Sequence, residues 1–345
     1  MGRRIADLRP TTAFATVDFD RPGRQVGFVM IPHSPHEDAW GVTRVPVAVI
    51  ANGSGPTAVI SGGNHGDEYE GPIVISEMIR DLDPATVSGR LILMPSLNAP
   101  AALAGTRTSP VDGKNFNRTF PGNPHGTMSE QISAYLSDAM FPIADAFLDL
   151  HSGGSSLSIM PSAIIEPTDD AALHKKNIAA AIAFGAPKTV VIANLGDPRT
   201  STAAACRAGL VTVGTEMGGG GTVSPDALRI CRQGVRNVLA HHGILPKDAA
   251  TPRQADTDVL ELPGANAYVF ASIDGIFEPF HEKGRAVTAG EPAGRIHTPW
   301  DPAREPEALA YQADGILYGI RQPGRVKPGN CCLVVAAPYR GTLSS

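Results

Sequence analysis

The chain lacks the sequence features that define membrane, secreted and nucleic-acid-binding proteins. No apolar run in its 345 residues approaches the roughly 18 that a membrane-spanning helix needs, and the N-terminus has no apolar segment of the secretion-signal type. Lysine and arginine are nowhere clustered and the formal net charge is −5, whereas phosphate neutralisation needs a concentrated basic face. We therefore expect a cytoplasmic protein that binds a small molecule, with neither a membrane nor a nucleic acid as partner.

Cysteine is also scarce. Cys206 and Cys231 stand apart, and only Cys331 and Cys332 are neighbours, so the sequence has neither the spaced pairs of a zinc ribbon nor a secreted disulfide framework. Glycine and proline are instead plentiful, at 37 and 30 residues, which indicates many tight turns.

Apolar runs and helix-like segments alternate from about residue 45 to 240. Short runs rich in valine and isoleucine, separated by amphipathic segments, predict an α/β domain whose helices cover a mixed, largely parallel sheet. The expected strands are residues 45–50, 57–60, 91–94, 146–150, 189–192 and 210–214. Two helices, one starting near Glu70 and one ending near His242, are expected from apolar side chains that share a face. These side chains are Ile73, Met78, Ile79 and Leu82 in the first, and Leu228, Val235, Val238 and Leu239 in the second.

A second unit is expected at the C-terminus. Residues 247–254 are polar, contain a proline and show no periodicity, so we predict a linker between a catalytic α/β domain at 1–246 and a β domain at 255–345. The β domain holds a weak repeat, because Asp274-Gly275-Ile276 and Asp314-Gly315-Ile316 are each followed by two glycines at similar spacings. This duplication predicts two similar β-hairpins packed into a small barrel or sandwich, similar to the hammerhead fold of biotinyl and lipoyl carriers.

The segment between the two repeats, residues 298–307, contains no lysine. A carrier of that fold would need one to attach its cofactor, so we expect the β domain to be structural or to gate the site. Residues 1–44 receive no functional assignment.

Potential metal ligands follow two of the expected strands. His65 and Glu68 form a His-x-x-Glu motif at one strand exit, and His151 follows the strand at 146–150. Ligands bind where parallel strands end at the same edge of a sheet, and zinc accepts this mixture of nitrogen and oxygen donors. Three protein ligands leave a fourth position for water, which is typical of a catalytic zinc. The alternatives are an acidic helix cap in the first segment and a turn-capping histidine in the second.

Further polar residues lie at other strand exits. Glu216 follows the strand at 210–214 and precedes four glycines, and a glutamate beside a metal can take a proton from water and pass it to a leaving amine. Its alternatives are a helix cap or a fourth ligand. Arg107, Asn117 and Arg118 lie in a long loop, where arginine forks can bind a substrate carboxylate or polarise a carbonyl.

The motifs His-x-x-Glu, Asn-x-Asn-Arg, Asp-Leu-His-Ser-Gly and Thr-Glu-Met-Gly-Gly, in this order, resemble the zinc carboxypeptidase-like clan. Within it they are similar to the succinylglutamate desuccinylase and aspartoacylase family. The direct match covers residues 61–221, and the family's small C-terminal β domain corresponds to about 255–345. The resemblance implies one zinc ion per subunit, held by His65, Glu68 and His151.

The same resemblance assigns the other roles. It implies that Glu216 promotes attack by water, that Asn117 and Arg118 grip the substrate carboxylate, and that Arg107 binds substrate or polarises its acyl oxygen. The family has a further arginine that polarises the acyl carbonyl shortly before the glutamate, and here Arg199 and Arg207 both lie in that stretch. The sequence does not choose among Arg107, Arg199 and Arg207.

Within the family, the phrases GGNHGDEYEGP, NFNRTFPG and TEMGGGG look closest to the N-alpha-acetyl-L-2,4-diaminobutyrate deacetylases of ectoine degradation. The implied activity is a zinc-dependent amidohydrolase that removes an acetyl group from a small N-acylated amino acid. Two alternatives stay open. One is a desuccinylase- or aspartoacylase-like deacylase or a carboxypeptidase, and the other is a non-catalytic metal- or partner-binding protein. The sequence also leaves open whether the chain forms a homo-oligomer.

Overall fold

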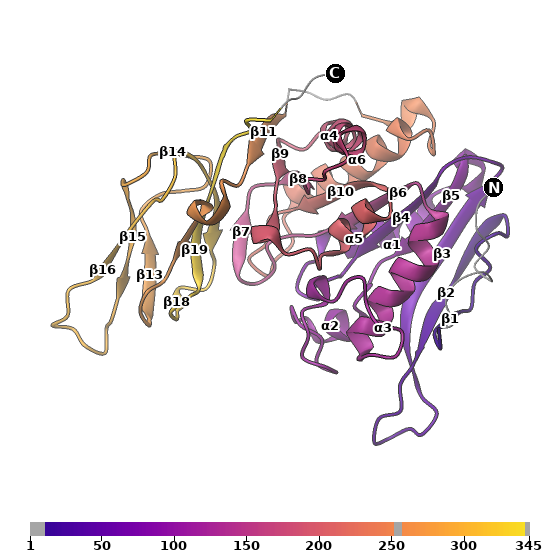
Figure 1. Cartoon of the computed structure of the whole chain (residues 1–345), viewed down its shortest axis with the longest axis horizontal. Coiled ribbons are helices and arrows are strands. Elements are labelled where there is room, and N and C mark those ends of the chain that lie inside the picture. The colour runs from indigo at the N-terminus through magenta and orange to yellow at the C-terminus, as the bar shows by residue number, and fades with distance from the viewer. Residues whose placement is uncertain (1–10, 252–256, 342–345) are drawn as a thin grey trace.

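A large mixed sheet covered by helices forms most of the molecule, and a smaller all-β part extends from one end (Figure 1). The structure is a computed structural model that describes residues 11–251 and 257–341. The N-terminal residues on which the secretion-signal prediction rests, and residues 252–254 of the expected linker, lie outside the described residues. Among the described residues, no helix has both the length and the apolar content to cross a membrane.

Among the described residues, the large sheet has 15 strands. Their order is β1 (Phe14–Ala15), β2 (Gly23–Pro32), β3 (Val42–Asn52), β5 (Gly89–Met94), β4 (Thr57–Gly62), β6 (Ala146–Leu150), β10 (Val211–Glu216), β8 (Ser162–Ile165), β9 (Lys188–Val191), β11 (Asp258–Glu261), β19 (Cys331–Pro338), β17 (Gly315–Arg321) and β14 (Ala286–Val287). Two further strands pair at its side, β12 (Tyr268–Phe270) with β19 and β7 (Leu157–Ile159) with β17. Strands β5, β4, β6 and β10 run parallel, as do β8, β9 and β11, while the other pairs are antiparallel.

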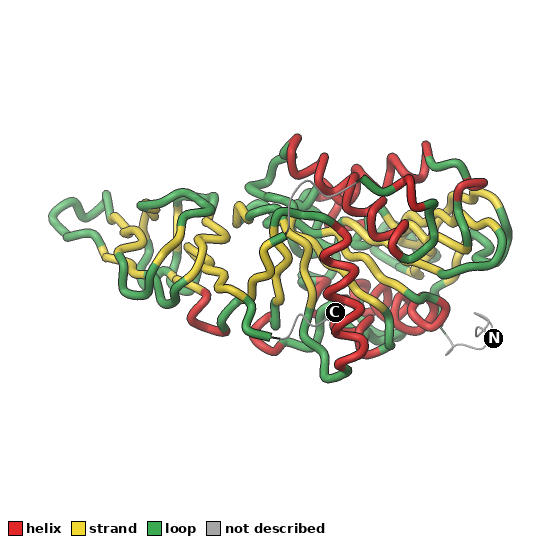
Figure 2. The backbone as a smooth tube through the Cα atoms, turned by 90° about the horizontal axis from the view of Figure 1, so that it is seen from above, coloured by secondary structure: helices red, strands yellow, loops and turns green. Residues whose placement is uncertain are grey.

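Helices cover both faces of the main sheet (Figure 2). They are α1 (Glu70–Asp81), α2 (Ala99–Ala104), α3 (Met128–Tyr135), α4 (Ala171–Phe184), α5 (Ser201–Arg207) and α6 (Pro225–His241). Shorter helical turns lie at 84–86, 116–118, 136–140, 141–143, 194–196, 247–249 and 264–267. Successive strand residues point to opposite faces, so β3 sends Ala48 and Ile50 toward α1, α4 and α6, and Val47 and Val49 toward α2, α3 and α5.

The six expected strands are present with shifted ends, as are the two expected helices. One detail was wrong. Ile73 lies outside the buried face of α1, whose apolar side chains are Val74, Ile75 and Met78, because these i, i+1 and i+4 positions face the sheet. Leu228 of α6 packs only partly buried against the same core.

The C-terminal repeat forms two related hairpins. Gly275 begins β13 (Gly275–Pro279) and Gly315 begins β17, and each of these strands leads through a short strand to a longer antiparallel partner. The two units exchange their short strands, since β14 pairs with β17 and β18 (Arg325–Val326) pairs with β13. The small sheet also contains β15 (Pro292–His297) and β16 (Glu307–Ala310). This arrangement is the expected sandwich of two hairpins.

The division into two domains remains a prediction. In the structure, β11 pairs on one side with β9 and on the other with β19, so the main sheet continues into the C-terminal strands. Residues 247–249, part of the expected linker, form a helical turn, and Ala250 packs against the main core.

Candidate metal centre and active site

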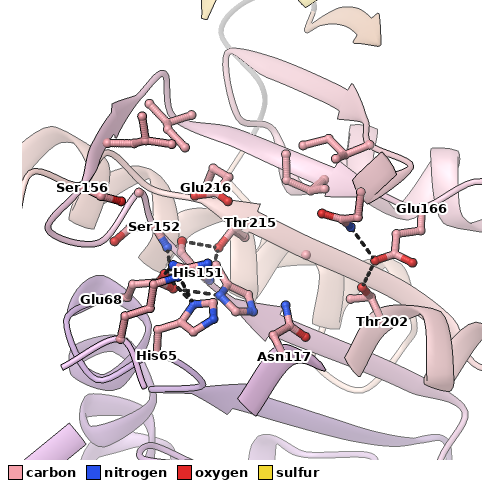
Figure 3. Close-up of a pocket in the computed structure, with 18 of the residues that line it drawn as sticks. His65, Glu68, Asn117, His151, Ser152, Ser156, Glu166, Thr202, Thr215 and Glu216 are labelled. Atoms are coloured by element: carbon pink, nitrogen blue, oxygen red, sulfur yellow. Dashed lines mark hydrogen bonds and ion pairs between the residues drawn. The ribbon is translucent and has the colours of Figure 1, made fainter. Parts of the chain in front are cut away.

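A cavity of about 260 Å³ lies beside the carboxyl ends of β4, β6 and β10. His65, Glu68, Asn117, His151 and Glu216 all line it. The parallel register brings these positions to one edge, because Gly62 of β4 is level with Leu150 of β6, and Asp149 with Gly214 of β10. The edge predicted from the sequence to bind a ligand is therefore the place where these side chains meet (Figure 3).

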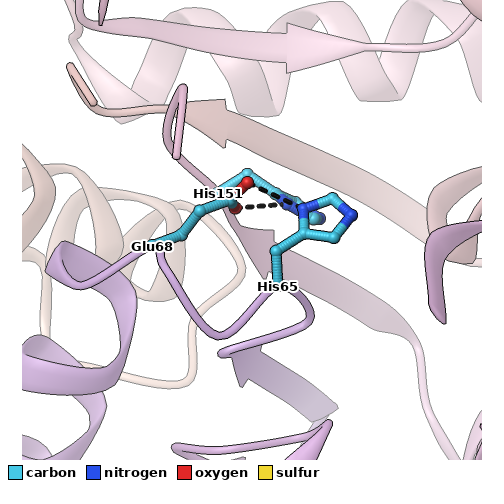
Figure 4. Close-up of side chains that lie close together, drawn as sticks. All are labelled: His65, Glu68 and His151. Atoms are coloured by element: carbon cyan, nitrogen blue, oxygen red, sulfur yellow. Dashed lines mark hydrogen bonds and ion pairs between the residues drawn. The ribbon is translucent and has the colours of Figure 1, made fainter. Parts of the chain in front are cut away.

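The side chains of His65, Glu68 and His151 point toward one another (Figure 4). Nδ1 of His65 lies 2.7 Å from Oε1 of Glu68, and Nδ1 of His151 lies 2.8 Å from Oε2 of the same carboxylate. Their candidate ligand atoms all lie within 4.8 Å of one another. Within residues 11–251 and 257–341, this is the one such group of three histidine, cysteine or carboxylate ligands.

The bend that carries His65 and Glu68 needs glycine. A Cβ on Gly66 would lie 1.9 Å from the carbonyl oxygen of Ala101, so only glycine lets this loop pass so closely to the backbone around α2. The backbone N–H of Gly66 also donates to the carbonyl of Thr106. The loop is thereby held against the segment that carries Arg107.

The outer nitrogen of each imidazole has its own acceptor. Nε2 of His151 lies 2.9 Å from Oδ2 of Asp149, and Nε2 of His65 lies 3.0 Å from Oδ1 of Asn115, which also accepts from a backbone N–H. If both Nε2 atoms carry the proton, both Nδ1 lone pairs face the carboxylate of Glu68. Three acceptors directed at one point repel each other unless a cation lies between them. In addition, zinc sites typically have a carboxylate that accepts a hydrogen bond from the other ring nitrogen of a ligand histidine, as Asp149 can from His151. The residues fit a divalent metal ion.

The three side chains also shift one another's pKa values. Burial favours the neutral forms, yet the carboxylates of Asp149 and Glu68 hold the pKa of His151 well above its ordinary value. The two imidazoles in turn hold the pKa of Glu68 well below its usual range, although burial acts the other way. Burial lowers the pKa of His65 and outweighs the attraction of Glu68. A carboxylate that stays ionised while 3% exposed is a strong ligand for a cation.

Glu216 ends β10 beside the three ligands (Figure 3). Its Oε2 atom is buried and accepts no hydrogen bond from any described residue. Burial, together with the nearby charge of Glu68, raises the pKa of Glu216 to about 8. A bound cation would lower this pKa, which would bring the carboxyl group into the range where it can both accept and donate a proton near neutral pH.

The chain is similar in sequence to known proteins. Residues 54–242 match the succinylglutamate desuccinylase/aspartoacylase catalytic domain. The N-alpha-acetyl-L-2,4-diaminobutyric acid deacetylase of Halomonas elongata is 38% identical over 97% of this chain and 98% of its own length. The chain belongs to the succinylglutamate desuccinylase/aspartoacylase family.

Solved structures of family members agree. A succinylglutamate desuccinylase/aspartoacylase from Rhodobacter sphaeroides is 42% identical, with a TM-score of 0.89 over 95% of this chain and 99% of its own. The product-bound ectoine utilization protein EutE (DoeB) from Ruegeria pomeroyi is 38% identical, with a TM-score of 0.91 over 95% of this chain and 100% of its own. Membership of the family confirms the expected α/β fold with its C-terminal β part and makes the chain a hydrolase of the class that cleaves amides.

The residues expected to bind substrate in this family member lie around the same cavity. Arg107, Asn117 and Arg118 all line it, and Nη1 of Arg107 lies 3.4 Å from Oε1 of Glu68. Arg118 is half-buried and pairs with Asp197, its Nε 3.1 Å from Oδ2. Asn117 accepts a hydrogen bond from the backbone N–H of Ser201 through Oδ1, which leaves its amide nitrogen on the cavity side.

The two other arginines left open by the sequence lie elsewhere. Arg199 is exposed and forms a two-pronged pair with Asp197, and Arg207 donates to the carbonyl of Pro198. Neither lines the cavity, whereas Arg107 does.

The residues at one end of the cavity were not predicted from the sequence. Glu166, Asn194 and Thr202 line the wall opposite the metal ligands, together with Ile164 and Ile192. The run Ile164-Ile165-Glu166-Pro167 is an apolar strand ended by a carboxylate. A strand prediction at 162–165 would have marked Glu166 as a candidate, but the antiparallel pairing of β8 with β10 is needed to place it in the cavity.

Proposed function

We propose that the chain is a zinc-dependent deacetylase that converts N-alpha-acetyl-L-2,4-diaminobutyrate to L-2,4-diaminobutyrate and acetate. The observation that carries this proposal is that His65, Glu68 and His151 converge on one point while the buried, unpartnered oxygen of Glu216 lies beside them. The deacetylase name of the Halomonas elongata relative and the ectoine-utilization role of the Ruegeria pomeroyi structure support the substrate.

His65, Glu68 and His151 would hold the zinc ion, and Asp149 and Asn115 would orient the two imidazoles. When bound, zinc supplies Lewis acidity that makes water a stronger nucleophile and polarises the acyl oxygen. Glu216 takes a proton from the attacking water and then delivers it to the departing amine, so that the C–N bond breaks as the nitrogen becomes neutral. Because Oε2 of Glu216 is buried, bulk water screens the charge of this carboxylate less, which strengthens its interactions with the reacting groups.

Arg107 and the Asn117–Arg118 pair would position the substrate. Arg107 is 43% exposed and lies next to Glu68, so its guanidinium can swing over the acyl oxygen, and we assign the polarising role to it because Arg199 and Arg207 do not line the cavity. Arg118 and the amide of Asn117 would bind the substrate carboxylate, for which a planar guanidinium is the best partner.

The size of the cavity argues for a small substrate. About 260 Å³ lies below the roughly 300–1,000 Å³ of pockets that take drug-sized ligands, so an acylated amino acid fits better than a peptide. This favours a deacylase over a carboxypeptidase.

The test is a hydrolysis assay of the zinc-loaded full-length protein with acetylated and succinylated diaminobutyrate, ornithine, aspartate and glutamate. We expect acetylated diaminobutyrate to be cleaved fastest, with acetate as product. The Glu216→Gln variant should retain stoichiometric zinc yet lose about 10²–10⁴-fold in kcat, since it keeps the shape of the side chain but cannot carry the proton. Near-normal turnover by this variant would remove Glu216 from the reaction, and preference for a succinylated substrate would replace the deacetylase with a desuccinylase.

A further inference from the structure

Glu166 is a buried acid at the end of the cavity that lies farthest from the metal ligands (Figure 3). It follows β8 directly, and its side chain is only 7% exposed. None of the catalytic steps described above uses it. A carboxylate in such a position is costly unless something compensates its charge.

The hydrogen bonds to Glu166 are unevenly distributed between its two oxygens. Oε1 accepts from the hydroxyls of Thr200 and Thr202 and from the amide of Asn194, the last two at 2.8 and 2.9 Å. No described residue donates to Oε2, and this atom is not one of the buried side-chain oxygens without a partner among the described residues. One oxygen is therefore fixed by three neutral donors while the other remains available to the cavity.

No cation of the described chain pairs with this carboxylate. The nearest candidate, Arg118, forms its ion pair with Asp197 instead. Burial raises the pKa of Glu166 above its ordinary value, and the hydrogen bonds from Thr200, Thr202 and Asn194, followed by the more distant charge of Arg118, offset this only in part. The site thus provides an oriented carboxylate that forms no ion pair with any described residue.

The path between the metal ligands and Glu166 is lined by small and apolar groups. Gly214 of β10 is level with Ile164 of β8, and a Cβ on Gly214 would lie 3.5 Å from Cβ of Ile164 and 3.8 Å from a methyl group of Thr202. Ile164 and Glu166 are two residues apart, so both face the same side of the sheet. A substrate with a short aliphatic side chain could run over Gly214 and place the polar end of that side chain at Glu166.

We propose that Glu166 is the residue that selects a substrate with a second, unacylated amine, by accepting a hydrogen bond from its ammonium group through Oε2. This inference rests on the proposed deacetylase function and adds the basis of its selectivity. The same carboxylate repels the side-chain carboxylate of an acylated aspartate or glutamate, so one residue both attracts the diamino acid and rejects the acidic one.

The experiment compares the zinc-loaded full-length enzyme with its Glu166→Gln variant on two substrates of the same shape. One is N-alpha-acetyl-L-2,4-diaminobutyrate, and the other is N-alpha-acetyl-L-norvaline, in which a methyl group replaces the ammonium. The wild-type enzyme should prefer the charged substrate at least about tenfold in kcat/KM. In the variant, kcat/KM for the charged substrate should fall by about 100-fold, the loss typical of an ion pair broken in a buried site. The value for the neutral substrate should change by less than about threefold, since that substrate never used the charge.

Glu282→Gln serves as the control, because it removes an exposed carboxylate of the C-terminal part and should leave both substrates unaffected. Equal losses on both substrates with zinc retained would show that Glu166 only supports the fold of the wall, and would overturn the inference. So would a wild-type enzyme that cleaves both substrates equally well, a result that does not depend on the variant folding. If the wild-type enzyme cleaves neither substrate, the proposed function itself fails and takes this inference with it.

Discussion

Asp149 orders the candidate metal centre, although it is not one of the three candidate ligands. Its buried carboxylate accepts hydrogen bonds from Ser61 at 2.7 Å, from Asn64 at 3.0 Å and from Ser201, and it faces Nε2 of His151 at 2.9 Å. Burial alone would raise the pKa of Asp149, but His151 and the hydroxyl groups hold it below its ordinary value. The ionised form therefore persists and fixes which nitrogen of His151 faces the metal.

Asp149→Asn should weaken zinc binding. The amide cannot accept from every one of these donors, so the ring of His151 is no longer held in one tautomer, and we expect a loss of about 10- to 100-fold in zinc affinity. Competition with a chromogenic chelator measures this directly. Asp145→Asn is the matched control, since Asp145 lies next to the other end of β6 and accepts from the backbone N–H of Thr57. Equal zinc affinity in the two variants would contradict the role given to Asp149.

The candidate metal ligands could be placed together from the sequence, whereas Glu166 could at most be recognised as a carboxylate at a strand end. His65 and His151 follow strands that run parallel, so strand exits alone place them together. Glu166 follows β8, which runs antiparallel to β10, and it sits level with the interior of that strand. Only the pairing register, which depends on contacts distant in sequence, brings it into the same cavity. The orientation of Arg118 toward Asp197 depends on such contacts too.

Helices α4 and α6 pack against each other through a glycine. A Cβ on Gly234 of α6 would lie 2.1 Å from the ring of Phe184, which is buried at the end of α4. Phe184 is almost fully buried within the main core, so a shift of its ring would disturb the packing of its neighbours. Glycine costs an isolated helix stability relative to alanine, so its presence in the middle of α6 reflects this contact.

Gly234→Ala should therefore destabilise the protein, although alanine favours helices. We expect the free energy of unfolding to fall by about 1–3 kcal/mol, the usual cost of overpacking a core, as measured by chemical denaturation. Arg236→Ala, two residues further along α6 and exposed, should change it by less than about 0.5 kcal/mol. A Gly234→Ala protein more stable than the wild-type protein would contradict this prediction, because it would mean that α4 and α6 can move apart at little cost in free energy.

Elements with a clear apolar pattern were predictable, and those without it were missed. The central strands are buried on both faces, so they appear as continuous apolar runs. Strand β2 buries Gln25 and Gly27 yet exposes Val26, and its outer face also carries half-buried Phe28 and Met30. Apolar residues on the outer face and a polar one on the inner face erase the alternation that marks a strand with one buried face.

One hydrophobic cluster joins the catalytic part to the C-terminal strands. It contains Val190 of β9, Leu260 of β11, and Tyr318 and Val334 of the last strands. The hydroxyl of Tyr318 also bonds to that of Ser162 in β8. Because β11 continues the sheet between β9 and β19, the C-terminal part shares both hydrogen bonds and core with the catalytic part. The composition of the sequence suggested two domains, but this continuity predicts that the two parts unfold together.

Leu260→Ala tests this continuity. Its buried side chain touches both parts, so truncation should lower the free energy of unfolding by about 2–5 kcal/mol. Hydrogen exchange should then show backbone amides of β10 and β17 losing protection to the same extent, since global unfolding exposes both. Leu309→Ala is the companion variant, because Leu309 packs only within the C-terminal cluster. If the chain unfolds as a single cooperative unit, Leu309→Ala should also lower the protection of β10 amides against hydrogen exchange. Two independently folding domains would instead leave β10 as protected as in the wild-type protein.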